Sequence, residues 1–204
     1  FYGIEINDFA VTVAKTALWI AESQMMKETE AIVHTSLDFL PLKSYANIIE
    51  GNALRMDWND VVPREKLSFI MGNPPFVGYS LQSKEQKNDI LSTYVDGKGK
   101  PYKTAGKIDY VAGWYFKAAQ LMKGTGIRAA FVSTNSITQG EQVAGVWKPL
   151  YERFNVYIDF AQRTFRWDSE ASLKAHVHVV IVGFSDGLNA NKKWLYSSER
   201  MSEV

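Results

Sequence analysis

The stretch "GNPPF" at residues 72–76 places hydrogen-bond acceptors and a flat apolar ring directly after an apolar run. Because a residue that precedes proline is disfavoured from helical geometry, Asn73 is expected to be extended, with its amide presented rather than buried. Asn73 Oδ1 and the Pro74 carbonyl can each accept one hydrogen from an exocyclic –NH2, and the two prolines bring no N–H groups of their own. Phe76 offers the attached ring a surface for stacking. Asn73, Pro74, Pro75 and Phe76 are therefore the predicted catalytic residues.

The chemistry that suits this arrangement is group transfer to a conjugated amine. Such an amine is a poor nucleophile because its lone pair is delocalised into the ring. Two fixed acceptors favour a pyramidal nitrogen and stabilise the positive charge that grows on it. The competing interpretation is that Asn-Pro-Pro only ends a strand, and the position of the motif in an α/β pattern favours the functional one.

The elements that position this motif follow from hydrophobic patterning, which predicts strands alternating with helices. Asn7 and Asp8 are good N-cap residues for the first helix, and Pro149 predicts a bend or an early stop in the last one. The pattern predicts an α/β fold with a doubly wound, mostly parallel sheet. The expected strands are 1–6, 44–51, 66–72, 127–136, 155–162 and 174–184, and the main helices are 9–28, 109–122 and 141–154.

Composition narrows the class of protein further. The chain has 204 residues, 46% of them hydrophobic, which fits one α/β domain with a real core. A formal net charge of +1 means that any contact with nucleic acid must come from local basic clusters. The absence of cysteine excludes thiolate chemistry and favours a reducing compartment, and no run of apolar residues predicts a membrane span or a signal peptide. The expected location is the bacterial cytoplasm.

The motif resembles the N/D-P-P-Y/F motif of the amino-methyltransferases of DNA. More of the chain is similar to the MmeI-like group, single-chain restriction-modification polypeptides that methylate adenine at N6. The resemblance covers nearly the whole chain in the family's order, and its segments are "GNALRMDW" (51–58), "NPPFVGYSLQSKEQKNDI" (73–90), "KIDYVAGWYFKAAQLM" (107–122), "FVSTNSITQGEQVAGVW" (131–147) and "RTFRW" (163–167). It implies a class I methyltransferase-like fold, double-stranded DNA as partner, and nuclease and target-recognition regions upstream and downstream in the same polypeptide.

The resemblance also implies S-adenosyl-L-methionine (AdoMet) as cofactor and assigns cofactor-binding roles to Glu5, Ile6, Asn52 and Ala53. A carboxylate at Glu5 can accept from the two ribose hydroxyls, and the amide of Asn52 can both accept from and donate to an adenine ring. Competing interpretations are a solvated glutamate and a plain turn. The resemblance places the family's glycine-rich loop on a first strand upstream of residue 1. We therefore expect a gap in the sheet, a substituted strand or an intermolecular contact there, and weak or no AdoMet binding and activity by the chain alone.

Relatives stack the flipped target base between the motif aromatic and a second aromatic in a later loop. The resemblance assigns these roles to Phe76 and Phe165, with Trp167 as an alternative to Phe165 and a core position as the competing interpretation. Lys98, Lys100 and Lys103, with Lys107, are spaced around Tyr102 in a long loop. They are predicted to contact DNA phosphates, although a merely solvated basic loop is also open.

No metal site is expected, because His176 and His178 alternate on a predicted strand without further ligands at suitable spacing. Residues 1–185 are expected to form a partial methyltransferase catalytic domain, and 186–204 a linker or the start of a target-recognition region. Two other functions stay open from the sequence. They are methylation of RNA or of a protein glutamine amide, and a non-catalytic DNA-binding scaffold.

Overall fold

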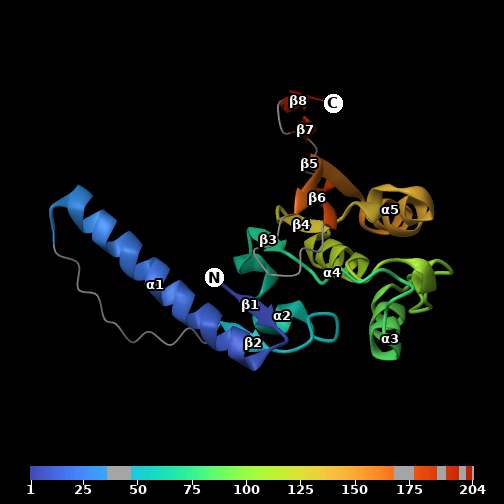
Figure 1. Cartoon of the computed structure of the whole chain (residues 1–204), viewed down its shortest axis with the longest axis horizontal. Coiled ribbons are helices and arrows are strands. Elements are labelled where there is room, and N and C mark those ends of the chain that lie inside the picture. The colour runs from blue at the N-terminus through green and yellow to red at the C-terminus, as the bar shows by residue number, and fades with distance from the viewer. Residues whose placement is uncertain (36–46, 168–176, 188–191, 198–200, 204) are drawn as a thin grey trace. The chain divides into compact units, whose positions relative to one another are not determined.

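The computed structural model describes residues 1–35, 47–167, 177–187, 192–197 and 201–203. The chain divides into two compact units, Phe1–Pro63 and Arg64–Val204 (Figure 1). Each unit carries its own sheet.

Unit 1 is built on two parallel strands, β1 (Gly3–Glu5) and β2 (Ile48–Glu50), which are paired residue by residue. Helix α1 (Asp8–Val33) follows β1, and the short helix α2 (Trp58–Val61) follows β2. The predicted N-cap is confirmed, because the Asn7 side chain accepts a hydrogen bond from the Ala10 N–H. The helix continues five residues beyond the expected range of 9–28 and ends at Val33, and its C-cap residue, His34, has the left-handed conformation with φ of 54°.

Unit 2 holds a six-stranded sheet in the order β3-β4-β6-β5-β7-β8. Strands β3, β4, β5 and β7 run in one direction, whereas β6 and β8 run in the opposite one. The sheet is thus mixed but mostly parallel, as the sequence predicts. Its strands are β3 (Phe69–Gly72), β4 (Arg128–Thr134), β5 (Val156–Trp167), β6 (Val177–Asp186), β7 (Trp194–Tyr196) and β8 (Met201–Glu203).

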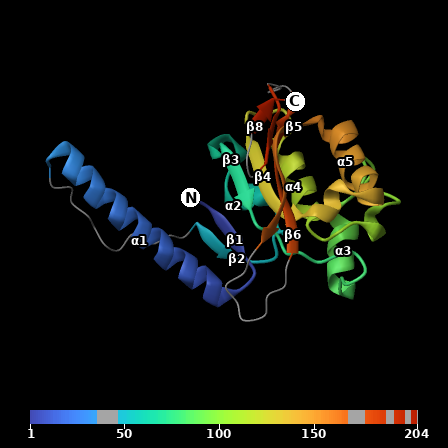
Figure 2. The same ribbon diagram turned by 45° about the horizontal axis from the view of Figure 1, so that its top comes forward.

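Helices α4 (Ala112–Met122) and α5 (Gly140–Phe154) lie on one side of this sheet, and α3 (Lys84–Thr93) packs against α4 (Figure 2). The core between helices and sheet is aromatic, and its largest fully buried side chains include Tyr94, Tyr115, Phe116, Phe131 and Phe184. Among its described residues, the unit also has the short 3-10 helices η1 (Arg64–Lys66), η2 (Ala105–Lys107) and η3 (Asn135–Thr138).

Helix α5 does not stop at Pro149, and the reason lies in a distant tyrosine. Proline has no N–H, so the Gly145 carbonyl one turn earlier loses its helical partner. The Tyr94 hydroxyl replaces it, donating to the carbonyl oxygens of Gly145 at 3.1 Å and Val146 at 2.5 Å. Tyr94 is fully buried, so this supplied donor prevents an unsatisfied carbonyl in the core and lets the helix run on to Phe154.

Two further elements differ from the sequence expectation. Strand β5 extends to Trp167 rather than ending near residue 162, because it pairs with β6 almost to its end and absorbs the mismatch in register shifts. The polar tail also contributes structure, since β7 pairs with β5 and β8 pairs with β7. The division of the chain at residue 185 stays a prediction.

Strand β3 is an edge strand of the unit 2 sheet. On β3 the apolar side chains of Phe69 and Met71 are 68% and 82% exposed. Unpaired edges with apolar side chains are sites where another strand can add. Among the residues that the structure describes, no helix is both long enough and apolar enough to span a bilayer.

Candidate functional site

The predicted catalytic and stacking residues lie at one edge of the unit 2 sheet. Because β3, β4 and β5 run in the same direction, the segments that follow them emerge at the same edge. Gly72 at the end of β3 pairs with Phe131, and β4 continues three residues further to Thr134. Thr134 pairs with Val179, which in turn pairs with Phe165. Phe165 is therefore about 10 Å further along the strand direction than the last residue of β3.

The Asn73 loop presents the two acceptors that the sequence predicts. Asn73 is exposed, whereas the next residue, Pro74, is buried and Phe76 is half-buried. Within the described parts of the chain, neither the Asn73 side chain nor the Pro74 carbonyl takes part in a hydrogen bond. Neither acceptor is thus used within the described residues, with Asn73 on the surface and Pro74 buried.

Hydrogen bonds to the segment before α4 fix the loop that carries this motif. The Tyr110 N–H donates to the Val77 carbonyl at 2.9 Å, and the Tyr79 N–H donates to Asp109 Oδ1 at 2.9 Å. The Gln82 amide donates to the Ile108 carbonyl at 2.9 Å. A fixed loop suits a site that must hold its acceptors in place before a ligand arrives.

Hydrogen bonds also fix the segment that follows β4. Ser136 Oγ donates to Asp109 Oδ2 at 2.5 Å and lies 2.8 Å from Thr134 Oγ1. The buried Trp147 indole of α5 donates to the Ile137 carbonyl at 2.9 Å. Sequence reasoning missed Asp109, Gln82 and Ser136 as parts of the site. The available signal was an aspartate between two apolar residues, Ile108 and Tyr110, in "KIDYV", where a polar side chain needs buried partners.

The second aromatic of the expected base-stacking pair lies in a strand and not in a loop. Phe165 and Trp167 belong to β5, where alternate residues share a face, and their ring centroids are 6.3 Å apart. Trp167 is 39% exposed and Phe165 is half-buried, so neither is a fully buried core residue. Phe165 also lines an open hollow of about 550 Å³ beside the register shift of β5, with Gln162, Arg163, Thr164 and Ser197.

The residues with expected cofactor roles lie together at the carboxyl edge of the unit 1 sheet. Glu5 ends β1, and its carbonyl accepts from the Gly51 N–H at 2.8 Å, so the residues that follow the two strands are neighbours. Glu5 Oε1 accepts from the Asn7 N–H at 3.0 Å, and Asn52 Oδ1 accepts from the Leu54 N–H at 2.9 Å. These bonds orient one oxygen of each side chain from within the loop.

The other two residues of this group contribute backbone and surface. Ile6 is 67% exposed, and the Ala53 carbonyl accepts from the Trp58 indole at 2.8 Å. Gly51 has a steric role, because a Cβ there would lie 2.2 Å from Met56 Sδ. The "GNAL" turn is therefore fixed by packing as well as by hydrogen bonds.

The loop that carries Lys98, Lys100 and Lys103 is stabilised by hydrogen bonds between its own residues. Asp96 accepts from the backbone N–H of Lys100 at 3.0 Å and of Lys98 at 2.8 Å, and these bonds lower the pKa of its carboxyl. Tyr102 is half-buried, with its ring edge-on to Tyr94 at 5.7 Å, so it anchors the loop instead of facing solvent. Lys98, Lys100 and Lys103 are exposed.

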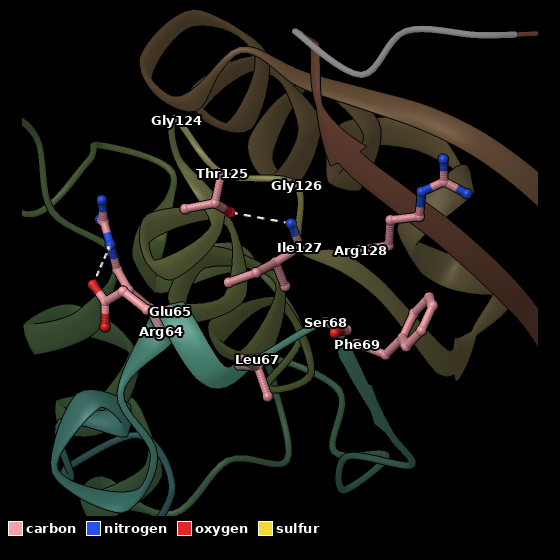
Figure 3. A pocket seen from close by; sticks show the side chains of 10 residues that line it. All are labelled: Arg64, Glu65, Leu67, Ser68, Phe69, Gly124, Thr125, Gly126, Ile127 and Arg128. Carbon is pink, nitrogen blue, oxygen red and sulfur yellow. Dashed lines mark hydrogen bonds and ion pairs between the residues drawn. The ribbon is translucent and has the colours of Figure 1, made fainter.

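A separate hollow of about 480 Å³ lies at the amino ends of the strands, where β3 and β4 begin (Figure 3). Arg64 and Glu65 form an exposed ion pair in its wall at 3.6 Å, and the Ile127 N–H donates to Thr125 Oγ1. None of the residues predicted to bind or react lines this hollow. His178 is exposed on β6, and His176 lies outside the described residues.

The chain is similar in sequence to proteins of a known family. Residues 1–197 match the family model described as "MmeI, DNA-methyltransferase domain". A Bacillus subtilis (strain 168) protein named DNA methyltransferase A is 43% identical over 202 residues, which are 98% of this chain and 22% of that protein. The chain therefore spans about a fifth of that relative.

Two solved structures resemble the whole chain. The Type IIL restriction-modification enzyme MmeI in complex with DNA is 44% identical, with a TM-score of 0.87 over 100% of this chain and 27% of that one. The DrdV–DNA complex is 16% identical, with a TM-score of 0.59 over 97% of this chain and 21% of that one, a likeness of fold alone.

Proposed function

Because the chain belongs to the family of the MmeI DNA-methyltransferase domain, we propose that it carries the target-base pocket and part of the cofactor site of an enzyme that methylates adenine N6 in double-stranded DNA. The fold is the class I methyltransferase-like α/β fold. The observation that carries the proposal is the pair of unoccupied acceptors, Asn73 Oδ1 and the Pro74 carbonyl, on a fixed loop at the carboxyl edge of the sheet.

The chemistry follows from how these acceptors meet an amine. Adenine N6 carries two hydrogens and a lone pair that is delocalised into the ring. When Asn73 Oδ1 and the Pro74 carbonyl each accept one hydrogen, the nitrogen is pulled toward tetrahedral geometry and its lone pair is localised. As the new N–C bond forms, the S–C bond of the sulfonium methyl donor would break and leave a neutral thioether, and both oxygens would stabilise the positive charge that passes to nitrogen. One of the two N6 protons would then leave to solvent, which gives the neutral methylated amine. No general base is needed before the methyl transfer, because the amine is already neutral.

The residues at the edge of unit 1 fit AdoMet. Glu5 is half-exposed, and its carboxylate can accept from two vicinal hydroxyls even while one oxygen accepts from the Asn7 N–H, because each oxygen has two lone pairs. Asn52 and the exposed Ile6 lie at the same edge and suit the adenine ring. The chemistry that AdoMet supplies when bound is a methyl group on a positively charged sulfur.

Replacing Glu5 with glutamine tests this assignment. Gln keeps the size of the side chain but loses a charged acceptor, so hydrogen bonds to the ribose hydroxyls weaken. We expect the affinity of the full-length protein for AdoMet to fall about 10-fold, in line with a hydrogen bond to a charged group. Calorimetric titration measures it. Glu50→Gln, in the paired position on β2, is the matched control, and equal affinities for both variants and the wild type would remove Glu5 from the cofactor site.

Double-stranded DNA is the proposed substrate because the MmeI structure, at 44% identity, is a complex with DNA and the curated relative is named a DNA methyltransferase. Inside a duplex, adenine N6 is out of reach of a protein pocket, so the nucleotide must leave the stack. The half-buried ring of Phe76 and the aromatic pair of Phe165 and Trp167 lie at the same sheet edge and can replace the lost stacking.

The choice between Phe165 and Trp167 can be measured. We expect Phe165→Ala to weaken capture of the flipped base by about 1–3 kcal/mol and Trp167→Ala to weaken it less. The reason is that Phe165 lies two residues nearer than Trp167 to the strand level at which β3 ends and the Asn73 loop begins. The fluorescence of 2-aminopurine at the target position of the duplex reports the flipped population. The opposite order would assign the stacking role to Trp167. An unchanged signal in both variants would remove β5 from the pocket.

The proposal also covers contacts with the DNA backbone and the neighbouring regions of the polypeptide. Lys98, Lys100 and Lys103 form an exposed basic loop suited to DNA phosphates. A nuclease region before this chain and a target-recognition region after it are proposed from the resemblance, with the bacterial cytoplasm as location.

The test of the function is the chemical identity of the product. Duplex DNA incubated with the full-length protein and AdoMet, then digested to nucleosides and examined by mass spectrometry, is expected to contain N6-methyladenine. Parallel incubations with RNA and with protein substrates cover the other conjugated amines. A methylated product found only on RNA or protein would overturn the proposal, and so would methylation of DNA at cytosine alone.

A further inference from the structure

Asp109 is a buried carboxylate that joins the two loops of the site. It is 6% exposed and lies just before α4. Its Oδ1 accepts from the Tyr79 N–H at 2.9 Å, in the loop that carries the catalytic motif after β3. Its Oδ2 accepts from Ser136 Oγ at 2.5 Å, in the segment after β4. One side chain therefore bridges segments that are 30 and 27 residues away in sequence.

The backbone around Asp109 is itself fixed on both sides. The Asp109 N–H donates to Gln142 Oε1 of α5 at 3.1 Å, and the same glutamine donates to the Lys107 carbonyl at 2.7 Å. The next N–H, of Tyr110, donates to the Val77 carbonyl at 2.9 Å. The carboxylate is therefore not free to follow either loop, and it holds both loops to one rigid point.

The bridge continues along the edge of the sheet toward the aromatic pair. Ser136 Oγ lies 2.8 Å from Thr134 Oγ1, and Thr134 is in the strand row of Val179 and Phe165. Hydrogen bonds therefore connect the Asn73 loop, through Asp109 and Ser136, to Thr134, which is at the same strand level as Phe165.

We propose that Asp109 is a positioning residue for methyl transfer, which fixes the catalytic loop against the segment after β4 so that the acceptors meet the amine in reactive geometry. This inference rests on the proposed function. It assigns Asp109 no contact with the base or the cofactor. Because a misplacement of about 1 Å can cost about 100-fold in rate, a loosened bridge acts on the chemical step more than on DNA binding.

Two substitutions separate positioning from charge. Asp109→Ala removes both bonds. In Asp109→Asn the side-chain oxygen still accepts from the Tyr79 N–H, and the new –NH2 donates to Ser136 Oγ, whose own hydrogen can turn to Thr134 Oγ1. The bridge therefore survives without its negative charge. Asp89→Ala is the matched control, since Asp89 on α3 is also buried and accepts from the Tyr110 hydroxyl at 2.9 Å.

The experiment measures single-turnover methylation of duplex DNA by the full-length protein, with duplex affinity and thermal unfolding measured on the same samples. We expect Asp109→Ala to slow the methylation step about 10- to 100-fold with duplex affinity unchanged, and Asp109→Asn to restore most of the rate. Asp89→Ala is expected to lower the unfolding temperature about as much as Asp109→Ala does, but to leave the methylation rate close to that of the wild type.

The outcomes are distinct. If Asp109→Ala slows methylation no more than Asp89→Ala at equal loss of stability, or if Asp109→Asn is as slow as Asp109→Ala, the positioning role is wrong while the proposed function stands. If the wild-type protein methylates no adenine in DNA, the proposed function fails and this inference fails with it.

Discussion

Replacing Asn73 with alanine in the full-length protein is expected to lower the rate of methyl transfer about 100- to 1,000-fold, the usual cost of removing one preorganised polar group from a transition state. The reason is that Asn73 Oδ1, exposed and free of hydrogen bonds to the rest of the described structure, is one of the two oxygens that receive the hydrogens of the target amine. Duplex affinity should be unchanged, because the interaction is made fully only as charge develops. Single-turnover transfer of a labelled methyl group measures the rate.

Two further variants sharpen that result. Asn73→Asp keeps an acceptor at the same position, so it should lose less activity than the alanine variant. Lys148→Ala, on an exposed turn of α5 where Lys148 pairs with Glu152 at 3.8 Å, should leave the rate unchanged. An alanine variant at position 73 that methylates at the wild-type rate would take Asn73 out of the chemistry.

Phe116→Ala is expected to destabilise unit 2 by about 3–5 kcal/mol, which is a large part of the stability of an ordinary domain. Phe116 is fully buried on α4, its ring centroid is 4.4 Å from Tyr94 and 4.9 Å from Phe154, and the Arg153 guanidinium lies 5.5 Å from its centre. Truncation removes these contacts and leaves a cavity that the neighbouring rings cannot fill. Urea unfolding followed by tryptophan fluorescence measures the change.

The matched control is Phe69→Ala on β3. The same atoms are removed, but Phe69 is 68% exposed, so a change of about 0.5 kcal/mol or less is expected. Equal losses in the two variants would mean that α4 does not pack on the aromatic core as described. The effect matters for function because α4 begins just after the segment that fixes the catalytic loop.

Local patterning predicted most of the fold. Alternation of apolar runs with turn residues placed the strands that precede Asn7, Asn52 and Asn73, and the Asn7 cap was readable because capping depends on neighbours within three residues. The exposure of Asn73 also followed from local geometry, since Pro74 restricts the residue before it. These features are decided by interactions close in sequence.

Features decided by distant residues could not be predicted in this way. Helix α5 continues through Pro149, and the Tyr94 hydroxyl satisfies a carbonyl 51 residues away that the proline leaves without its helical partner. Strand β5 extends to Phe165 and Trp167 because β6 pairs with it, so both aromatics lie in a strand rather than in the expected loop. The Asp109 bridge depends on two loops meeting, which no spacing along the chain reports.

The central claim is that Asn73 Oδ1 and the Pro74 carbonyl hold the exocyclic amine of an extruded adenine. A structure of the full-length protein bound to its duplex, with a non-reactive analogue of AdoMet, measures this directly. We predict that the amine nitrogen lies about 2.7–3.2 Å from both oxygens, with the purine ring against Phe76. A target base that stays in the duplex stack, or an extruded base whose amine points away from both oxygens, would contradict the account.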